Sequence, residues 1–222
     1  METMPKETFH KLSPDKKKKI IDRFLREFST NSYDDASLTT VVKSLGIAKG
    51  SIYQYFDGKL DLFLFLQSEC AAIKAKYIGH VKRDDYPDFW AYFRALYLEG
   101  LRFDLEHPLE SNFLHNLARH IHAPSLKELT KQWFDQVIEI MCKWIQYEVD
   151  TGHFRNDLPV KSMAFFLYTV SISIGDYMRT MYGLNLEENI KSGKPVYGEQ
   201  RGRILMRAVD DYINLLRKTF EK

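Results

Sequence analysis

Two runs of apolar residues at helical spacing, with an interruption that begins at Gly46, lie between residues 37 and 59 and constrain the fold more than any other part of the sequence. The first run is Leu38, Val41, Val42 and Leu45, and the second is Ile52 and Phe56. Gly46 separates them, and glycine adopts the left-handed backbone that closes a helix without steric cost. Two short helices joined by such a turn form a helix-turn-helix.

Polar residues at the start of the first helix are suited to contacts with DNA. Ser37 fits the N-cap, because its hydroxyl can accept a free backbone N–H, and Thr40 then stands at the third helical position. Thr39 lies between them. We therefore expect Ser37, Thr39 and Thr40 at a DNA interface.

The second helix, expected over Lys49 to Phe56, divides into two faces. If Ile52 and Phe56 point inward, Gly50, Ser51 and Gln54 lie toward the outside. A glutamine can pair with an adenine edge through two hydrogen bonds, and a serine can meet several base edges. Four further side chains can reach phosphate oxygens, which fix the register without reading the sequence. They are Lys49, Tyr53, Tyr55 and Lys59. The alternative is an ordinary solvated helix face.

The segment GIAKGSIYQYFDGKLDLF, from Gly46 to Phe63, resembles the DNA-binding signature of the TetR family of bacterial regulators. That signature opens on glycine, an aliphatic residue, a small residue, lysine and glycine, and continues with a Tyr-x-x-Phe pair and a downstream lysine. The pair here is Tyr53 and Phe56, followed by Lys59. The resemblance covers about a quarter of the chain.

The chain departs from the family pattern at two places. Asn31 and Ser32 precede Tyr33 where a glycine is usual, and Leu60 and Asp61 follow the lysine where glutamates are common. Neither change removes a groove-facing group. The resemblance implies a homodimeric regulator, most simply a repressor, which binds a palindromic double-stranded operator and is released by a small-molecule effector. It also implies an all-α fold.

Charge and composition agree with a DNA-binding head on a neutral body. Residues 1–60 hold 11 Lys and Arg against 8 Asp and Glu, whereas the whole chain carries only +2. Cys70 and Cys142 form no CxxC motif and are expected to be reduced thiols. The N-terminus lacks an apolar signal core, and no uncharged run is long enough to cross a bilayer. We therefore expect a cytoplasmic protein with no membrane contact.

Breaks in the helical pattern divide the chain into two domains. We expect a three-helix DNA-binding domain over residues 1–58, a connecting helix over 59–80 and a helical ligand-binding and dimerisation domain over 81–222. Residues 1–12 are expected to form a mobile arm, and the Lys16–Lys19 run is either a phosphate contact or a solvated face. Proline and glycine mark the ends of the later helices. The first helix is expected to begin at Pro14, with Ser13 as its N-cap, and to run to about Phe28. The later helices are expected over 87–106, 109–120, 125–151, 159–182 and 200–220.

Large aromatic residues are frequent in the second domain. The resemblance implies an effector pocket there, and an apolar or aromatic ligand would suit it. The candidates to line it are Trp90, Phe93, Tyr97, Phe113, Trp133, Tyr168 and Tyr177. Such stripes at helical spacing more often form core than ligand contacts, so this alternative stays open. The last two long helices are apolar enough to form a dimer interface or simply core.

The sequence offers little support for an enzyme. His115, His120 and His122 form a local cluster, but the helix is expected to end before His122, so a metal site there is disfavoured. HExxH, G-x-S-x-G, G-x-G and phosphate-loop motifs are absent. We expect no catalytic residue, metal or cofactor. Two alternatives remain: a helix-turn-helix protein whose helical domain holds a protein partner, and, more weakly, a helical enzyme with an appended DNA-binding head.

Overall fold

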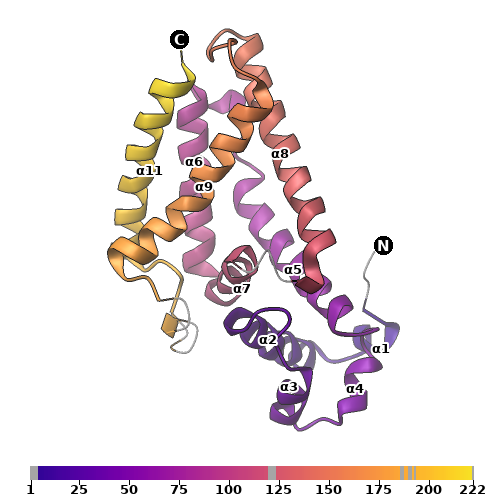
Figure 1. The fold of residues 1–222 in the computed structure, drawn as a ribbon. Coiled ribbons are helices and arrows are strands. Elements are labelled where there is room, and N and C mark those ends of the chain that lie inside the picture. The colour runs from indigo at the N-terminus through magenta and orange to yellow at the C-terminus, as the bar shows by residue number, and fades with distance from the viewer. Residues whose placement is uncertain (1–4, 120–123, 186–187, 190–191, 193, 222) are drawn as a thin grey trace. The chain divides into compact units, whose positions relative to one another are not determined.

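The computed structural model describes residues 5–119, 124–185, 188–189, 192 and 194–221, and within them helices account for nearly all regular structure. The described residues hold one isolated β-bridge, between Phe154 and Glu221, and no longer strand. The all-α prediction is therefore confirmed. The chain packs into two compact units, of which unit 1 comprises residues 1–77, 103–125 and 186–196 and unit 2 the remainder (Figure 1).

Unit 1 contains the three helices of the expected DNA-binding head: α2 (Pro14–Thr30), α3 (Leu38–Leu45) and α4 (Lys49–Tyr53). Ser13 caps α2 by accepting the Lys16 N–H, and Pro14 occupies the first helical turn, where its missing N–H is no loss. The core-facing residues of these helices are fully buried. They include Phe24, Leu25, Phe28, Val41, Val42 and Ile52.

Two further helices lie in unit 1. The connecting helix is α5 (Lys59–Ile78), and α7 (Pro108–Arg119) packs extensively along α2. Phe113 of α7 lies in an aromatic cluster, with its ring centroid 5.5 Å from Phe63 and 6.5 Å from Phe28. Helix α7 therefore packs against the DNA-binding head, although it begins about fifty residues after the end of α4. The expected functional division at residues 58 and 80 stays a prediction.

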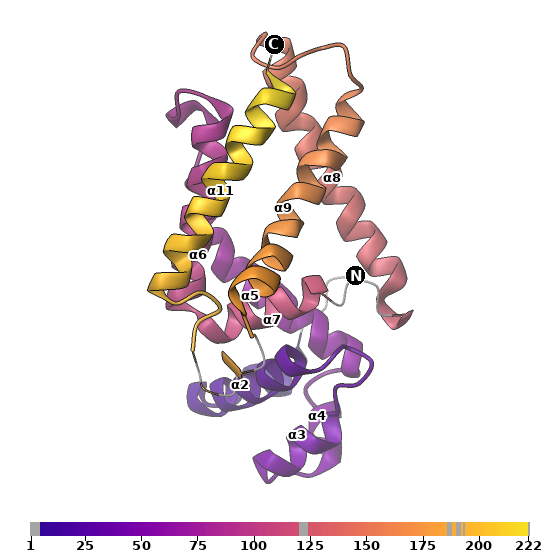
Figure 2. The ribbon, with the colours of Figure 1, turned by 60° about the vertical axis from the view of Figure 1, so that its left-hand side comes forward.

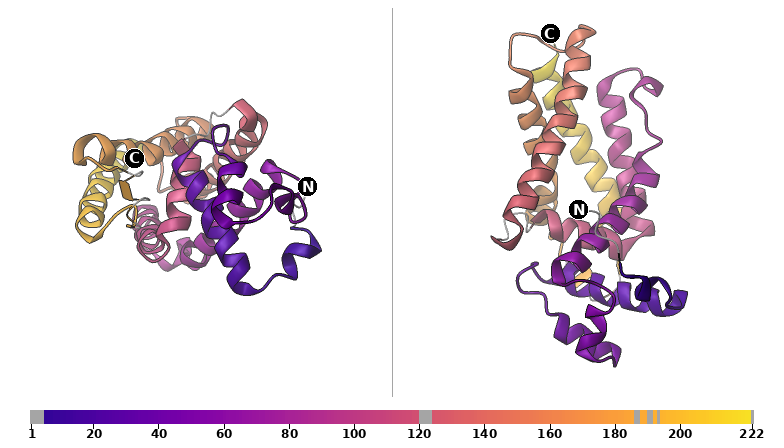
Figure 3. Two further views of the ribbon diagram at one scale, coloured as in Figure 1. Left: turned by 90° about the horizontal axis from the view of Figure 1, so that it is seen from below. Right: turned by 90° about the vertical axis from the view of Figure 1, so that its right-hand side faces the viewer.

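The segment expected to be a mobile arm is partly ordered, and this expectation is wrong for residues 5–12. They form the short helix α1 (Glu7–His10), the darkest helix in the right-hand view of Figure 3. The reason is Phe9, which is only 2% exposed and packs among other aromatic rings of the head. Residues 1–4 lie outside the described part of the chain.

Unit 2 is built from long helices: α6 (Phe89–Glu106) up to residue 102, α8 (Lys127–Asp150), α9 (Val160–Tyr182) and α11 (Glu199–Phe220). Helix α9 packs along α8 and contacts α11 (Figure 2). Short 3-10 turns, η1 (Arg83–Asp85) and η2 (Pro124–Leu126), precede α6 and α8. The expected later helices are all found, with ends that differ from the predictions by at most two residues. His120, the predicted end of α7, lies outside the described residues.

Candidate DNA-binding site

The helix-turn-helix is present, and the predicted capping residues Ser37 and Gly46 lie at the two ends of α3. The Ser37 hydroxyl accepts the Thr40 N–H at 3.2 Å, while the Ser37 N–H donates to a Glu27 carboxylate oxygen of α2 at 2.8 Å. Gly46 ends α3 with φ of 68°, the left-handed conformation that glycine tolerates best. Its N–H and that of Ile47 return to carbonyls of α3. Local residues therefore fix both ends of α3 and the direction in which α4 leaves.

Helix α4 is shorter than expected, because it ends at Tyr53 rather than at Phe56. Gln54 is its C-cap, still in the right-handed helical region at φ −76°. The side chain of Gln54 is exposed, Tyr53 is 48% exposed and Ser51 is half-buried. No atom lies within 4 Å of a Cβ placed on Gly50. This face can approach a DNA groove.

The other predicted DNA contacts differ in accessibility. Thr40 is exposed, whereas Ser37 and Thr39 are half-buried at the start of α3. The side chain of Lys49 lies outside what the structure describes. These residues stay candidates for DNA contact.

Tyr55 does not fit its predicted role. It was expected to reach phosphate from the flank of the second helix, yet its side chain is only 7% exposed and its ring centroid lies 5.9 Å from that of Phe9. The helix ends before Tyr55, so the chain turns and directs the ring inward. The structure corrects this prediction: Tyr55 belongs to the core of the head.

Lys59 also has a role inside the head. Its Nζ donates to the backbone carbonyl of Asp34 at 3.1 Å and lies 4.8 Å from the centre of the Tyr33 ring. Partial burial lowers the pKa of Lys59, against the opposing effect of Asp34, Asp35 and Glu27. Lys59 thus links α5 to the turn before α3, and its predicted phosphate contact stays a prediction.

Of the predicted effector residues, Phe113 is misplaced. It is fully buried in unit 1 between Phe28 and Phe63, so it forms head core and does not accompany the aromatics of unit 2. Its helical spacing gave no sign of this, because only the packing of α7 on α2 decides which rings it meets. The structure corrects this prediction.

The remaining aromatic candidates belong to unit 2. Trp90 and Phe93 are buried, and Tyr97 donates its hydroxyl proton to the Ser171 carbonyl at 3.3 Å, with burial raising the pKa of Tyr97 to about 12. Trp133, Tyr168 and Tyr177 are half-buried. Tyr168 packs against Phe134, and Tyr177 against Tyr182 and Tyr212. Whether any of them contacts an effector stays a prediction.

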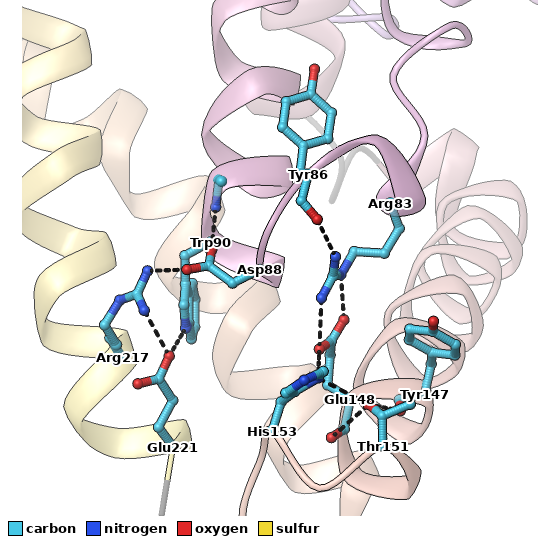
Figure 4. A network of polar contacts seen from close by, with 11 residues as sticks. Arg83, Tyr86, Asp88, Trp90, Tyr147, Glu148, Thr151, His153, Arg217 and Glu221 are labelled. Carbon is cyan, nitrogen blue, oxygen red and sulfur yellow. Dashed lines mark hydrogen bonds and ion pairs between the residues drawn. The ribbon is translucent and has the colours of Figure 1, made fainter.

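A cavity of about 300 Å³ in unit 2 is lined by Trp90 together with polar residues. Its other lining residues are Asp88, Phe89, Glu148, His153, Phe154 and Glu221. Figure 4 shows that its carboxylates are bonded within the chain. Arg217 bridges Asp88 and Glu221, while Trp90 donates to Glu221 at 2.8 Å.

The second half of this network surrounds Glu148, which is 1% exposed (Figure 4). Arg83 donates to both of its oxygens, with the Nη2–Oε2 distance at 3.1 Å, and His153 approaches at 3.0 Å. The hydrogen bond and charge of Glu148 raise the pKa of Arg83 against the effect of burial. The Arg83–Glu148 pair thus links η1 to α8, and the contacts of Arg217 and Glu221 link the start of α6 to the end of α11.

Other functional chemistry finds little support in the described residues. They contain no group of three or more histidine, cysteine or acidic side chains that could hold a metal. His115 contacts Asp104 at 3.5 Å, whereas His120 and His122 lie outside the described residues. Cys70 is buried, which raises the pKa of its thiol, and Cys142 is also a free thiol. In the part of the chain that the structure describes, no helix combines the length and apolarity needed to cross a membrane.

The capped helix α3, its left-handed glycine turn and the exposed face of α4 define a helix-turn-helix DNA-binding protein. A family model described as "Bacterial regulatory proteins, tetR family" matches residues 20–66. The chain is 23% identical over 201 residues to the HTH-type transcriptional repressor AcnR of Corynebacterium diphtheriae, with 81% of this chain and 94% of that protein covered.

Solved structures extend the likeness to the whole chain. A TetR family transcriptional regulator from Chloroflexus aurantiacus J-10-fl shares 25% identity, with a TM-score of 0.78 and 99% of each chain covered. The ketosteroid transcriptional regulator KstR2 of Mycobacterium tuberculosis shares the fold, with 12% identity, a TM-score of 0.54, and 95% of this chain and 97% of that chain covered. The family model thus matches the DNA-binding head, and most of the chain is similar to transcriptional regulators of the TetR family. These likenesses and the helix-turn-helix support a DNA-binding transcriptional regulator.

Proposed function

We propose that this regulator is a cytoplasmic repressor that binds a palindromic operator as a homodimer and is released by a small-molecule effector. The observation that carries the proposal is the outward side of α4, which comes directly after the capped helix α3. It carries the half-buried Ser51 and the exposed Tyr53, and the exposed Gln54 follows at the C-cap. The relative AcnR is named a transcriptional repressor, which supports the direction of regulation.

DNA recognition by this face would divide between reading and positioning. Gln54 and Ser51 suit base edges in the major groove, and Tyr53 and Thr40 suit phosphate oxygens. Because Tyr55 is buried within the head, it is left out of the interface that we propose. The exposed Lys16 and Lys19 remain candidates for additional phosphate contacts.

Dimerisation would use α9 and α11. Helix α9 presents large apolar side chains that are about half exposed in the single chain: Phe165 at 53%, Phe166 at 45% and Ile172 at 55%. Leu215 of α11 is 61% exposed. Exposed apolar patches mark interaction sites on soluble proteins. A two-fold dimer would place two heads on half-sites about one helical turn, or a small multiple, apart.

The effector would act within unit 2, where apolar and aromatic side chains dominate the core. Trp90 lines the cavity described above, and Phe93, Tyr97 and Tyr168 lie on the helices α6 and α9. KstR2, which shares this fold, is named a ketosteroid regulator. An apolar or aromatic ligand suits these aromatic side chains, while the cavity also presents carboxylates and His153. Allosteric coupling between effector and DNA typically amounts to ~1 to 3 kcal/mol, or roughly 5- to 150-fold in affinity.

The proposal is tested by selecting binding sites from genomic DNA with the purified full chain and footprinting the best fragment. A palindromic footprint with two half-sites is expected. Candidate ligands suggested by the adjacent genes are then added, and release of the DNA supports the effector role. Weak binding that is salt-sensitive and blind to sequence would contradict base reading by α4.

A further inference from the structure

The recognition helix α4 has only five residues, Lys49–Tyr53, and depends on its surroundings for its shape. An isolated helix of this length is unstable in water, because nucleation costs more than the few hydrogen bonds return. The last carbonyls of any helix also lack partners within the helix. What satisfies those carbonyls therefore decides how firmly the end of α4 is held.

In this protein the partners come from residues 6–8, which immediately precede or begin α1. Lys6 Nζ donates to the Tyr53 carbonyl at 2.9 Å, and the Lys6 N–H donates to the Tyr55 carbonyl at 2.8 Å. Between them, the Thr8 hydroxyl donates to the Gln54 carbonyl. Three successive carbonyls at the end of the recognition helix are thus bound by a segment more than forty residues away in sequence.

Charge and packing hold the same segment in place. The Lys6 ammonium forms an ion pair with Asp57 at 2.7 Å, and a cation at a helix C-terminus is favourable to the helix dipole. Phe9 anchors α1: its ring centroid lies 5.1 Å from Phe56 and 5.7 Å from Phe65. The anchor sets where Lys6 and Thr8 can reach.

We propose that residues 5–10 act as a clamp that positions the recognition helix, with Lys6 and Thr8 as positioning residues for sequence-specific DNA binding. This inference rests on the proposed function of α4 and extends the DNA-binding machinery to a segment that precedes the helix-turn-helix. Tyr53 and Gln54, whose side chains face outward, are two of the residues whose carbonyls the clamp holds. Loosening it lowers the fraction of molecules in the binding-competent pose and hence the apparent affinity.

Thr8→Val provides the sharpest test, because it removes one hydroxyl and changes neither charge nor size. The measurement is the ratio of affinities for the selected operator and for a random-sequence duplex. One lost hydrogen bond predicts a decrease of about 2- to 10-fold in this ratio. Thr8→Ser keeps the hydroxyl and should restore it. Amide chemical shifts of residues 53–55 should move in Thr8→Val and return in Thr8→Ser.

Thr130→Val is the matched control, since the Thr130 hydroxyl bonds to the Lys127 carbonyl of its own helix, α8, in unit 2. Its affinity ratio should equal that of the wild type. Equal ratios for wild type and Thr8→Val would overturn the clamp while leaving the proposed function intact. A wild-type protein with no sequence preference would instead overturn the proposed function, and the clamp with it.

Lys6→Met separates positioning from direct phosphate contact. If Lys6 positions α4, the affinity ratio falls and the salt dependence stays unchanged. If Lys6 contacts phosphate directly, the slope of log affinity against log salt decreases by about one while the ratio is kept. The second outcome would overturn the positioning role of Lys6. Thermal unfolding of each variant confirms that the head remains folded.

Discussion

Gln54 performs two tasks at one position, because its backbone closes α4 while its side chain stays exposed. Its carbonyl accepts the Thr8 hydroxyl, which leaves the amide group of the side chain available for bases. Gly46 also has a backbone role, because its left-handed conformation ends α3 and sets the direction in which the chain continues to α4. Individual residues of the head can therefore be tested separately for reading DNA and for holding shape.

Gln54→Ala should remove sequence preference and leave the fold unchanged. A two-pronged contact with adenine contributes about 1 to 3 kcal/mol of discrimination. The measurement is a binding-site selection with the variant, compared with wild type. Gln136→Ala, at an exposed position of α8, is the control and should select the wild-type site. An unchanged preference in Gln54→Ala would remove Gln54 from base reading.

Gly46→Ala should destabilise the protein, since a Cβ in the left-handed region costs roughly 1 to 2 kcal/mol. Gly46 has φ of 68°, and space is not the issue because nothing lies within 4 Å of the added Cβ. Gly50→Ala is the matched control: the same substitution inside α4 should be neutral or stabilising by up to ~1 kcal/mol. Denaturant unfolding of both variants measures the difference, and equal effects would contradict the backbone explanation.

Asp104 makes stability depend on acidic pH. It is 5% exposed in unit 1, and although burial raises its pKa, His115, Ser111 and Lys74 lower it to a net value below the usual range. The unfolded chain then binds more protons than the folded one, so stability rises with pH in this window.

This contribution is fully present above the unfolded pKa of about 4 and is lost as pH falls through the folded pKa. Asp104→Asn should therefore be less stable at neutral pH and lose less stability on acidification. Urea unfolding across pH 2 to 7 tests this. Parallel pH profiles for variant and wild type would exclude Asp104 as the source.

At the scale of elements, the end of α2 depends on a different helix. The buried Asn116 of α7 donates from Nδ2 to the carbonyls of Phe28 and Asn31, each at 2.8 Å. These carbonyls lie at the end of α2, where a helix lacks internal partners. Helix α7 thus caps the helix on which α3 packs, much as α1 supports α4. At the ends of both α2 and α4, backbone carbonyls accept hydrogen bonds from side chains of a different helix or of the segment that precedes it.

Asn116→Ala should cost about 1 to 3 kcal/mol of stability, because two buried carbonyls lose their donor. Asn214→Ala, at an exposed position of α11, should change stability by no more than about 0.5 kcal/mol. Thermal or denaturant unfolding gives both values. If the two variants match, water or another group satisfies the carbonyls and α7 does not cap α2.

At the scale of the molecule, the exposed apolar side chains of α9 are the basis of the proposed dimer interface. Ile172→Glu should separate the proposed dimer into monomers and abolish cooperative operator binding, since a charge would be buried at the interface. Sedimentation measures the oligomeric state. Ile140→Glu adds the same charge at a similarly exposed position of α8, 48% against 55% for Ile172. Dissociation by Ile140→Glu alone would move the interface to α8.

The sequence by itself determined the local structure of this protein. Ser37, Gly46 and the apolar spacing around them specified α3 and the turn, because capping and backbone conformation depend on a few adjacent residues. Proline and glycine similarly marked the ends of the later helices. The family signature lies in the same segment, so the class of protein could also be predicted from it.

Only the tertiary structure decided which side chains remain available for function. Tyr55 and Lys59 were both predicted to face DNA. Because α4 ends early, the Tyr55 ring is buried, and the Lys59 ammonium donates to the Asp34 carbonyl in the turn before α3. Phe113 joined the head, and Phe9 ordered a segment expected to be mobile. Each outcome depends on contacts between residues distant in sequence, whose partners no local pattern specifies. Burial is decided by that long-range packing, whereas helix formation is largely decided nearby.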